Sequence, residues 1–90
     1  MKVEENVYLC KLFDCYAPLL SARQNEILDL YLNDNLTISE IAENFGITRQ
    51  AVLDGISKAE KRLNSFEEKL HFLEKLNSLQ EKVDTLAKKS

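Results

Sequence analysis

The sequence predicts an all-α protein, in which a helical domain with a helix-turn-helix precedes a long C-terminal helix. Three observations carry this prediction. The 90 residues contain only two glycines and one proline, so few turns can interrupt the chain. Apolar residues recur at three- and four-residue spacing along most of the chain. A single glycine, Gly46, separates two short stretches of this kind between residues 37 and 63.

The composition is typical of a soluble chain that forms one domain, or one small domain with an extension: 44% of the residues are apolar and 30% are charged. No run of about 18 apolar residues could span a bilayer. The first ten residues carry two acids and no long apolar region, unlike a secretory signal. We therefore expect a cytoplasmic protein. Cys10 and Cys15 lie on different faces of one predicted helix, so we expect two small buried thiols and no disulfide.

The formal net charge is −3, which counts against a strongly basic nucleic-acid binder. Residues 1–36 hold three basic and six acidic side chains, residues 37–63 hold four of each, and residues 64–90 hold five of each. Because no segment is a basic block, contact with nucleic acid would require a local cluster.

The first two predicted helices span residues 4–17 and 21–32. A broad apolar stripe marks the first: Val7, Leu9, Cys10, Leu12, Phe13 and Tyr16. Pro18 disfavours helical geometry at the residue before it, so this helix should end or kink there. Ser21 and Gln24 form a capping box that opens the second helix, and the polar residues 33–35 end it.

The predicted helix-turn-helix spans residues 37–63. Thr37 and Glu40 form a capping box for its first helix. Gly46 can adopt the left-handed conformation that ends a helix, and Thr48 can cap the second helix. One face of that helix is apolar: Val52, Ile56, Ala59 and Leu63. The small Ala42 suits a close helix crossing, although an ordinary αα-hairpin would carry the same packing residues.

Residues 64–90 contain no glycine or proline, so the sequence predicts one uninterrupted helix from the helix-turn-helix onward. We therefore divide the chain into a domain of residues 1–63 and an extension of residues 64–90. The extension carries an apolar row whose spacing shifts near Leu76, and Phe72 widens it there. Either the first two helices or a second chain must cover this row. We expect a homodimer in which it forms the interface: Phe66, Leu70, Leu73, Leu76, Leu79, Val83 and Leu86.

The sequence offers no residue set for catalysis, for a cofactor or for a metal site. It has no glycine-rich phosphate loop and no Ser/His/Asp grouping, and its carboxylates alternate with lysines as on solvated helix faces. His71, the only histidine, is interpreted as a surface residue on a long helix. We expect a protein that is not an enzyme.

The residues now described resemble a known family. The segment from Leu36 to Leu63 is similar to the helix-turn-helix of sigma-factor region four. Nearly the whole chain resembles the YlxM family of small bacterial proteins, and the most specific part is residues 47–52 (ITRQAV) followed by Asp54. The resemblance also rests on residues 12–14, 19–21, 39–43, 49–52, 60–61 and 67–70, with Tyr16, Gln24, Phe45 and Ile56. It implies an all-α dimer with a role in the signal recognition particle pathway, and a protein of that particle as a partner.

Two departures from the family pattern weaken the expectation of tight phosphate binding. Gly55 stands where a larger, polar residue is expected, at a cost of roughly 1 kcal/mol in helix propensity. Residues 57–59 are less basic than in many relatives.

The first functional hypothesis is a DNA-binding regulatory protein, whose second motif helix enters the major groove. RNA is the alternative nucleic-acid ligand for the same surface. The residues placed at this surface are Thr48, Arg49, Gln50, Leu53, Asp54, Ser57, Lys58, Lys61 and Arg62. Arg49 would pair with guanine and Gln50 with adenine. Asp54 opposes this hypothesis, because it needs a cytosine amino group or Arg49 as its partner.

The second hypothesis is a non-enzymatic adaptor that uses the same surface to bind protein or RNA of the signal recognition particle. Balanced charge and the exposed Leu53 favour it, since a mixed surface suits protein recognition. Gly55 would let the backbone of a partner approach closely.

Overall fold

The computed structural model describes residues 3–89, and the side chains of residues 7–88. Every regular element among these residues is helical, which confirms the all-α prediction. The elements are α1 (Val3–Tyr16), the 3₁₀ turn η1 (Ala17–Leu19), α2 (Ala22–Leu32), α3 (Ile38–Phe45), α4 (Arg49–Leu70) and α5 (Phe72–Lys89).

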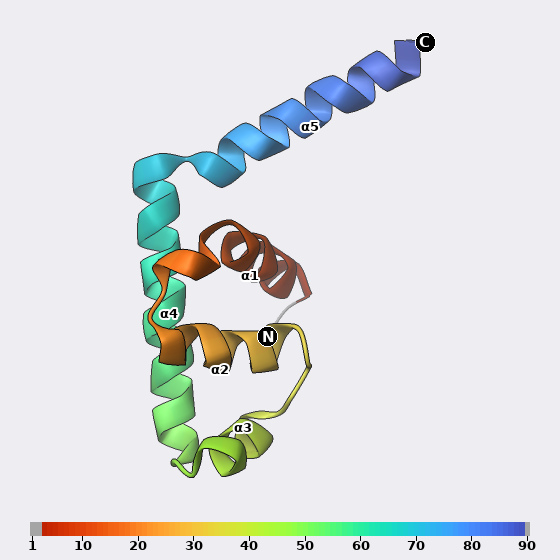
Figure 1. Ribbon diagram of the computed structural model, residues 1–90. Helices are drawn as coiled ribbons and strands as arrows, with labels where there is room; N and C mark the ends of the chain where they lie inside the picture. The colour runs from red at the N-terminus through yellow and green to blue at the C-terminus, as the bar shows by residue number, and fades with distance from the viewer. Residues whose placement is uncertain (1–2, 90) are drawn as a thin grey trace.

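Helix α4 is the axis of the molecule. Helices α1, α2 and α3 all pack against it, stacked along one side in Figure 1. Helix α5 leaves the end of α4 and projects away from the bundle, and its contact with the bundle is made to α1. The molecule is consequently elongated, 54 Å in its longest dimension and 25 and 20 Å in the others.

The core lies between the inner face of α4 and the three helices beside it. The apolar face predicted for α4 is confirmed, since Val52, Ile56, Ala59 and Leu63 are all buried. Each fully buried aliphatic side chain contributes roughly 1.5–3 kcal/mol to stability. The earlier helices supply the other side of this core: Leu9, Leu12, Phe13, Tyr16, Leu20, Ile27, Leu28, Ile41 and Ala42.

Local signals set the ends of the first two helices as the sequence predicts. Helix α1 stops at Tyr16, and Pro18 lies in the 3₁₀ turn that follows. Ser21 caps α2, with its hydroxyl accepting from the Gln24 N–H and the Gln24 side chain accepting from the Ser21 N–H. Helix α2 ends at Leu32, directly before the polar residues 33–35.

The prediction of one uninterrupted helix after Leu63 is wrong. Helix α4 ends at Leu70, His71 adopts the left-handed conformation with φ of 52°, and α5 begins at Phe72. His71 therefore occupies a break between two helices instead of the middle of one. The proposed division of the chain after residue 63 lies inside α4.

The predicted burial of α1 is only partly confirmed. Val7 is 49% exposed, and Cys10 and Cys15 are half-buried free thiols. The reason is that α2, α4 and the start of α5 cover α1 and leave its remaining surface open. Burial still raises the pKa of Cys15, and the nearby carboxylates of Glu67 and Asp14 raise it further.

Candidate nucleic-acid interface

Three capping devices that the sequence predicts set the ends of α3 and the start of α4. Thr37 and Glu40 exchange hydrogen bonds in a capping box at the start of α3. These hydrogen bonds hold the pKa of Glu40 below its ordinary value. Gly46 ends α3 in the left-handed conformation, with φ of 65°. The Thr48 hydroxyl then accepts the Ala51 N–H at 3.0 Å and caps α4.

Gly46 is required by its backbone conformation and not by lack of space. A Cβ at this position would meet no heavy atom within 4 Å. The Gly46 N–H donates to the Glu43 carbonyl, and the Ile47 N–H donates to the Ala42 carbonyl at 3.0 Å. The turn thus satisfies carbonyls at the end of α3 and aims the chain into α4.

Two small residues, one on α3 and one on α4, let α3 and α2 approach α4 closely. Ala42 is buried in α3, which packs against α4. Gly55 of α4 faces α2, where a Cβ would lie 3.2 Å from Cδ1 of Ile27. The expectation that Gly55 admits the backbone of a partner is therefore wrong, because the glycine accommodates Ile27 of its own chain.

The outer face of α4 presents most of the predicted interface residues to solvent. The exposed members are Thr48, Arg49, Gln50, Leu53, Asp54, Ser57, Lys58 and Lys61. Leu53 is 46% exposed, so an apolar side chain stands among polar ones. The Gln50 Nε2 donates to Asp54 Oδ1 at 3.0 Å. Within the chain, Asp54 therefore has Gln50 as its partner, and not Arg49, which is one of the two partners expected from the sequence.

Arg62 differs from the other predicted interface residues because its guanidinium binds its own chain. It donates to Oε1 of Gln24 at 2.8 Å and to the Leu19 carbonyl at 3.2 Å. The guanidinium carbon also lies 5.5 Å from the ring centroid of Phe66. Arg62 thus fastens α4 to the start of α2, and it is not available to a phosphate without loss of these contacts.

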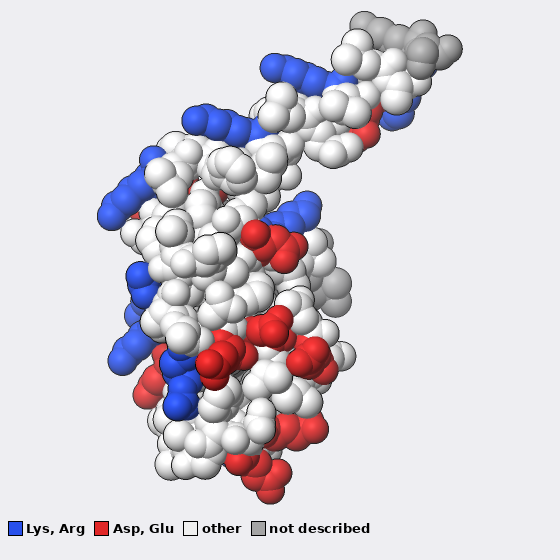
Figure 2. All heavy atoms as spheres, viewed as in Figure 1, with Lys and Arg blue, Asp and Glu red and all other residues white. Residues whose placement is uncertain are grey.

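The charges are distributed unevenly over the surface. In Figure 2, several Lys and Arg side chains project along the left edge, where α4 and the start of α5 lie, and acidic side chains gather over the lower right, near α2 and α3. The edge formed by α4 and the start of α5 is therefore more favourable to a polyanion than the net charge of −3 implies.

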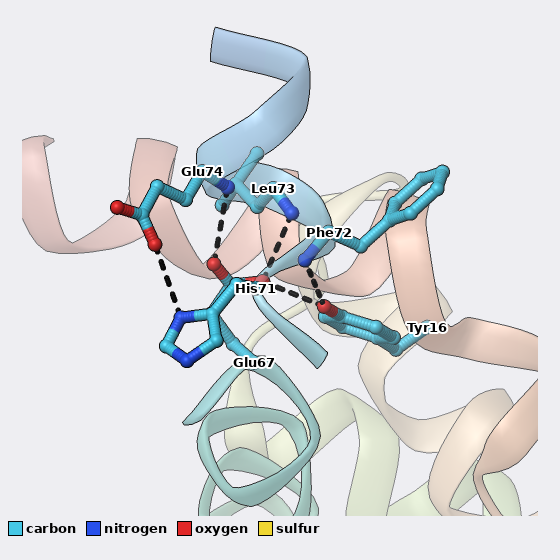
Figure 3. A network of polar contacts seen from close by, with 6 residues as sticks. All are labelled: Tyr16, Glu67, His71, Phe72, Leu73 and Glu74. Carbon is cyan, nitrogen blue, oxygen red and sulfur yellow. Dashed lines mark hydrogen bonds and ion pairs between the residues drawn. The ribbon is translucent and has the colours of Figure 1, made fainter. Parts of the chain in front are cut away.

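A polar network at the junction of α4 and α5 fixes the far end of α4 (Figure 3). The Tyr16 hydroxyl donates to Glu67 Oε1 at 2.6 Å and accepts the Phe72 N–H at 3.1 Å. The same carboxylate accepts the N–H groups of Leu73 and Glu74, at 2.9 and 3.1 Å. Glu67 therefore caps α5, whose first amide groups lack partners within the helix.

The network shifts the ionisation of its own members. Burial raises the pKa of Glu67, but the hydrogen bonds from Tyr16, Leu73 and Glu74 outweigh burial and lower it below its ordinary value. Burial raises the pKa of Tyr16, and its bond to the Glu67 carboxylate raises it further. His71 also belongs to this network, because its Nδ1 lies 3.0 Å from a carboxylate oxygen of Glu74.

The residues assigned to a dimer interface fall into two environments. Leu73 is 5% exposed and packs in the core of its own chain, and Phe66 is half-buried beside Tyr16. The others are exposed: Leu70, Leu76, Leu79, Val83 and Leu86.

Within the described residues, no group of three or more His, Cys, Asp or Glu side chains could hold a metal ion. Over the same range, no helix is long and apolar enough to cross a membrane.

Comparison with known proteins identifies the family. Residues 3–90 match the family described as "Putative helix-turn-helix protein, YlxM / p13 like" (UPF0122). A UPF0122 protein of Limosilactobacillus reuteri is 46% identical over 71 residues, which cover 79% of this chain and 63% of the relative. A UPF0122 protein of Lacticaseibacillus casei is 41% identical over 86 residues, or 96% of this chain and 76% of the relative.

The UPF0122 protein YofM of Lactococcus lactis is 46% identical over 71 residues, covering 79% of this chain and 64% of the relative. The matched region thus spans less than two thirds of the length of some of these relatives. The match over residues 3–90, together with these identities, confirms the family that the sequence resembles. The chain belongs to the YlxM / p13-like (UPF0122) family of helix-turn-helix proteins.

Proposed function

We propose that the protein is a non-enzymatic regulatory protein that binds nucleic acid through the outer face of α4, with DNA as the first ligand to test and RNA as the second. One observation carries the proposal. The first turns of α4 expose Arg49, Gln50 and Ser57, while the opposite face of the same turns is buried in the core at Val52 and Ile56. A rigidly held helix with a polar outer face is what major-groove reading requires.

In this proposal the N-terminal end of α4 meets the base edges. Arg49 pairs with guanine, and Gln50 pairs with adenine once it leaves Asp54. Lys58 and Lys61 follow on the same exposed face and contact phosphates. Arg62 contributes by holding α4 against α2 and not by binding DNA directly.

We further propose that the protein acts in the cytoplasm as a homodimer and takes part in the signal recognition particle pathway. The resemblance noted in the sequence motivates the pathway. The exposed apolar residues of α5 motivate the homodimer, since solvated helices seldom carry such a row.

The salt dependence of DNA binding tests the proposal. Fluorescence anisotropy with a labelled random duplex should show binding at about 50 mM salt. If Lys58 and Lys61 each neutralise one phosphate, the logarithm of the association constant should fall with the logarithm of salt with a slope of roughly −2 per chain.

Lys58→Ala should reduce that slope by about one, whereas Lys11→Ala, which removes an exposed charge on α1, should leave it unchanged. Absence of binding at about 50 mM salt to duplex DNA and to duplex or single-stranded RNA would refute the proposed function.

A second candidate is an adaptor that docks this face onto a protein of the signal recognition particle. The Gln50–Asp54 pair beside the exposed Leu53 favours it, because an acid and a leucine suit a protein surface better than a phosphate backbone. Titration of the chain with purified particle proteins tests this candidate.

A further inference from the structure

The break at His71 divides the apolar residues of the C-terminal region into two separate rows. Leu73 turns into the core of its own chain and ends the row that comes from α4. A new row begins one residue earlier, at Phe72, and its members follow at spacings of four, three, four and three. We call it the α5 seam: Phe72, Leu76, Leu79, Val83 and Leu86. These are the a and d positions of a heptad repeat, without the irregularity that Leu73 introduces.

The α5 seam has no cover within one chain. Its five side chains are between 41% and 69% exposed, and every side chain from Glu74 to Lys88 is exposed. An isolated helix of this length is marginal in water, so α5 needs a partner surface to be stable.

A second apolar surface adjoins the α5 seam at its base. Leu19 and Pro18 of η1 line a shallow hollow together with Leu70 and Phe72. Leu19, Leu70 and Phe72 are each about half exposed. Phe72 belongs both to this hollow and to the α5 seam, so the two apolar surfaces share this side chain.

We propose that a second copy of this chain covers the α5 seam, with the two α5 helices parallel and in register and the two hollows meeting at the base. The inference rests on the homodimer proposed above; it limits the α5 part of the interface to the α5 seam and adds the orientation and the register.

The charges that flank the α5 seam favour the parallel orientation. Lys75 and Lys82 occupy the g positions on one side, and Gln80 and Ala87 occupy the e positions on the other. Parallel helices bring a g position of one chain beside an e position of the other, so the lysines meet Gln80 and Ala87. Antiparallel helices would bring the two rows of lysines together, where they repel each other.

The residue types within the α5 seam agree with this orientation. Leu79 and Leu86 occupy d positions, and the β-branched Val83 occupies an a position. Leucine at d with a β-branched residue at a favours two-stranded parallel coiled coils. Leu73 falls at an e position beside the α5 seam, but its burial in its own chain leaves the interface to Phe72 and the residues that follow.

Disulfide trapping tests the orientation, in a full-length chain whose native cysteines are replaced by alanine. Leu86→Cys should give a covalent dimer on mild oxidation, because parallel helices place the two copies of residue 86 side by side. Glu81→Cys is the matched control, since residue 81 is exposed on the face of α5 opposite the α5 seam, and it should stay monomeric on a denaturing gel.

Sedimentation of the parent chain and of a variant in the α5 seam tests whether the chain forms a dimer through this seam. The parent chain should sediment at twice the monomer mass at about 50 µM. Leu79→Glu should raise the dissociation constant at least about tenfold, because each chain loses a buried leucine. Its helix content at high concentration reports that the domain still folds.

Two results would overturn the inference. A dimer that Leu86→Cys does not trap, but that a mixture of Leu76→Cys and Leu86→Cys chains does trap, is antiparallel, because antiparallel helices pair an a position of one chain with a d position of the other. A parent chain that sediments as a monomer at this concentration refutes the homodimer as well. Neither result affects the DNA titration, which tests the nucleic-acid proposal separately.

Discussion

Tyr16 and Glu67 lie 51 residues apart in the sequence and meet in a hydrogen bond of 2.6 Å. This bond ties the end of α1 to the junction of α4 and α5. Because the tyrosine oxygen and the carboxylate also accept three N–H groups at the start of α5, one contact between distant residues determines where α5 begins.

Tyr16→Phe should lower the free energy of unfolding by about 1–3 kcal/mol. The change leaves Glu67 without its hydroxyl donor and the Phe72 N–H without its acceptor, while the buried ring remains. Urea denaturation of both proteins measures the difference. Tyr8→Phe, at an exposed position of α1, is the control and should change stability by less than about 0.5 kcal/mol. Equal losses in the two variants would contradict the role given to Tyr16.

The stability of the protein should fall in acid partly through Glu67. Its pKa is lower in the folded chain than in the unfolded chain, where it is about 4.3. Glu67 therefore contributes stability that is fully present above the unfolded pKa and is lost as the pH falls through the folded pKa. Thermal melts between pH 7 and 3 should show a shallower decline for Glu67→Gln than for the parent. Glu68→Gln, at an exposed position beside it, should follow the parent curve.

Gly46→Val should destabilise the fold by more than about 1 kcal/mol, because a β-branched residue resists the positive φ of the turn. Gly46→Asn should cost less, since asparagine tolerates the left-handed conformation and a Cβ meets no obstacle here. Thermal midpoints of the three proteins decide the matter. An equal loss for valine and asparagine would mean that space, and not φ, limits the position.

Asp54→Asn should strengthen binding to random duplex DNA by up to about 1 kcal/mol, because it removes a charge that repels phosphates. The matched control is Asp84→Asn on α5. Asp84 accepts from Gln80 at 3.0 Å in the same arrangement as Asp54 from Gln50. If both variants bind DNA equally, the effect is one of net charge alone. If Asp54→Asn weakens a complex with a protein of the signal recognition particle and leaves DNA binding unchanged, the result supports the adaptor hypothesis.

The helix-turn-helix could be predicted from the sequence because short-range interactions specify it. Thr37, Glu40, Gly46 and Thr48 all act on backbone groups within a few residues of themselves. The buried face of α4 follows from its helical period in the same way.

The break at His71 could not be predicted, because no glycine or proline marks it. Its reason lies far away in the sequence, in Tyr16, and in the burial of Leu73 against the bundle. The engagement of Arg62 with Gln24 and the Leu19 carbonyl is missed for the same reason.

A sequence signal did exist for Gly55. It stands four residues before the buried Ala59, and two small residues at this spacing mark a side of a helix that another helix can approach closely. The structure places Ile27 of α2 against Gly55.

Helix α4 carries the candidate interface at its first turn and Glu67 near its last, and no break separates the two. From Arg49 to Glu67 the helix rises roughly 27 Å. A rotation of α4 by roughly 5° about its Glu67 end would displace Arg49 by roughly 2 Å relative to α5. A small change in the contacts of Tyr16 and Glu67 with α5 would thus produce a larger displacement at the N-terminal end of α4. In the proposed homodimer, it would change the distance between the N-terminal ends of the two α4 helices.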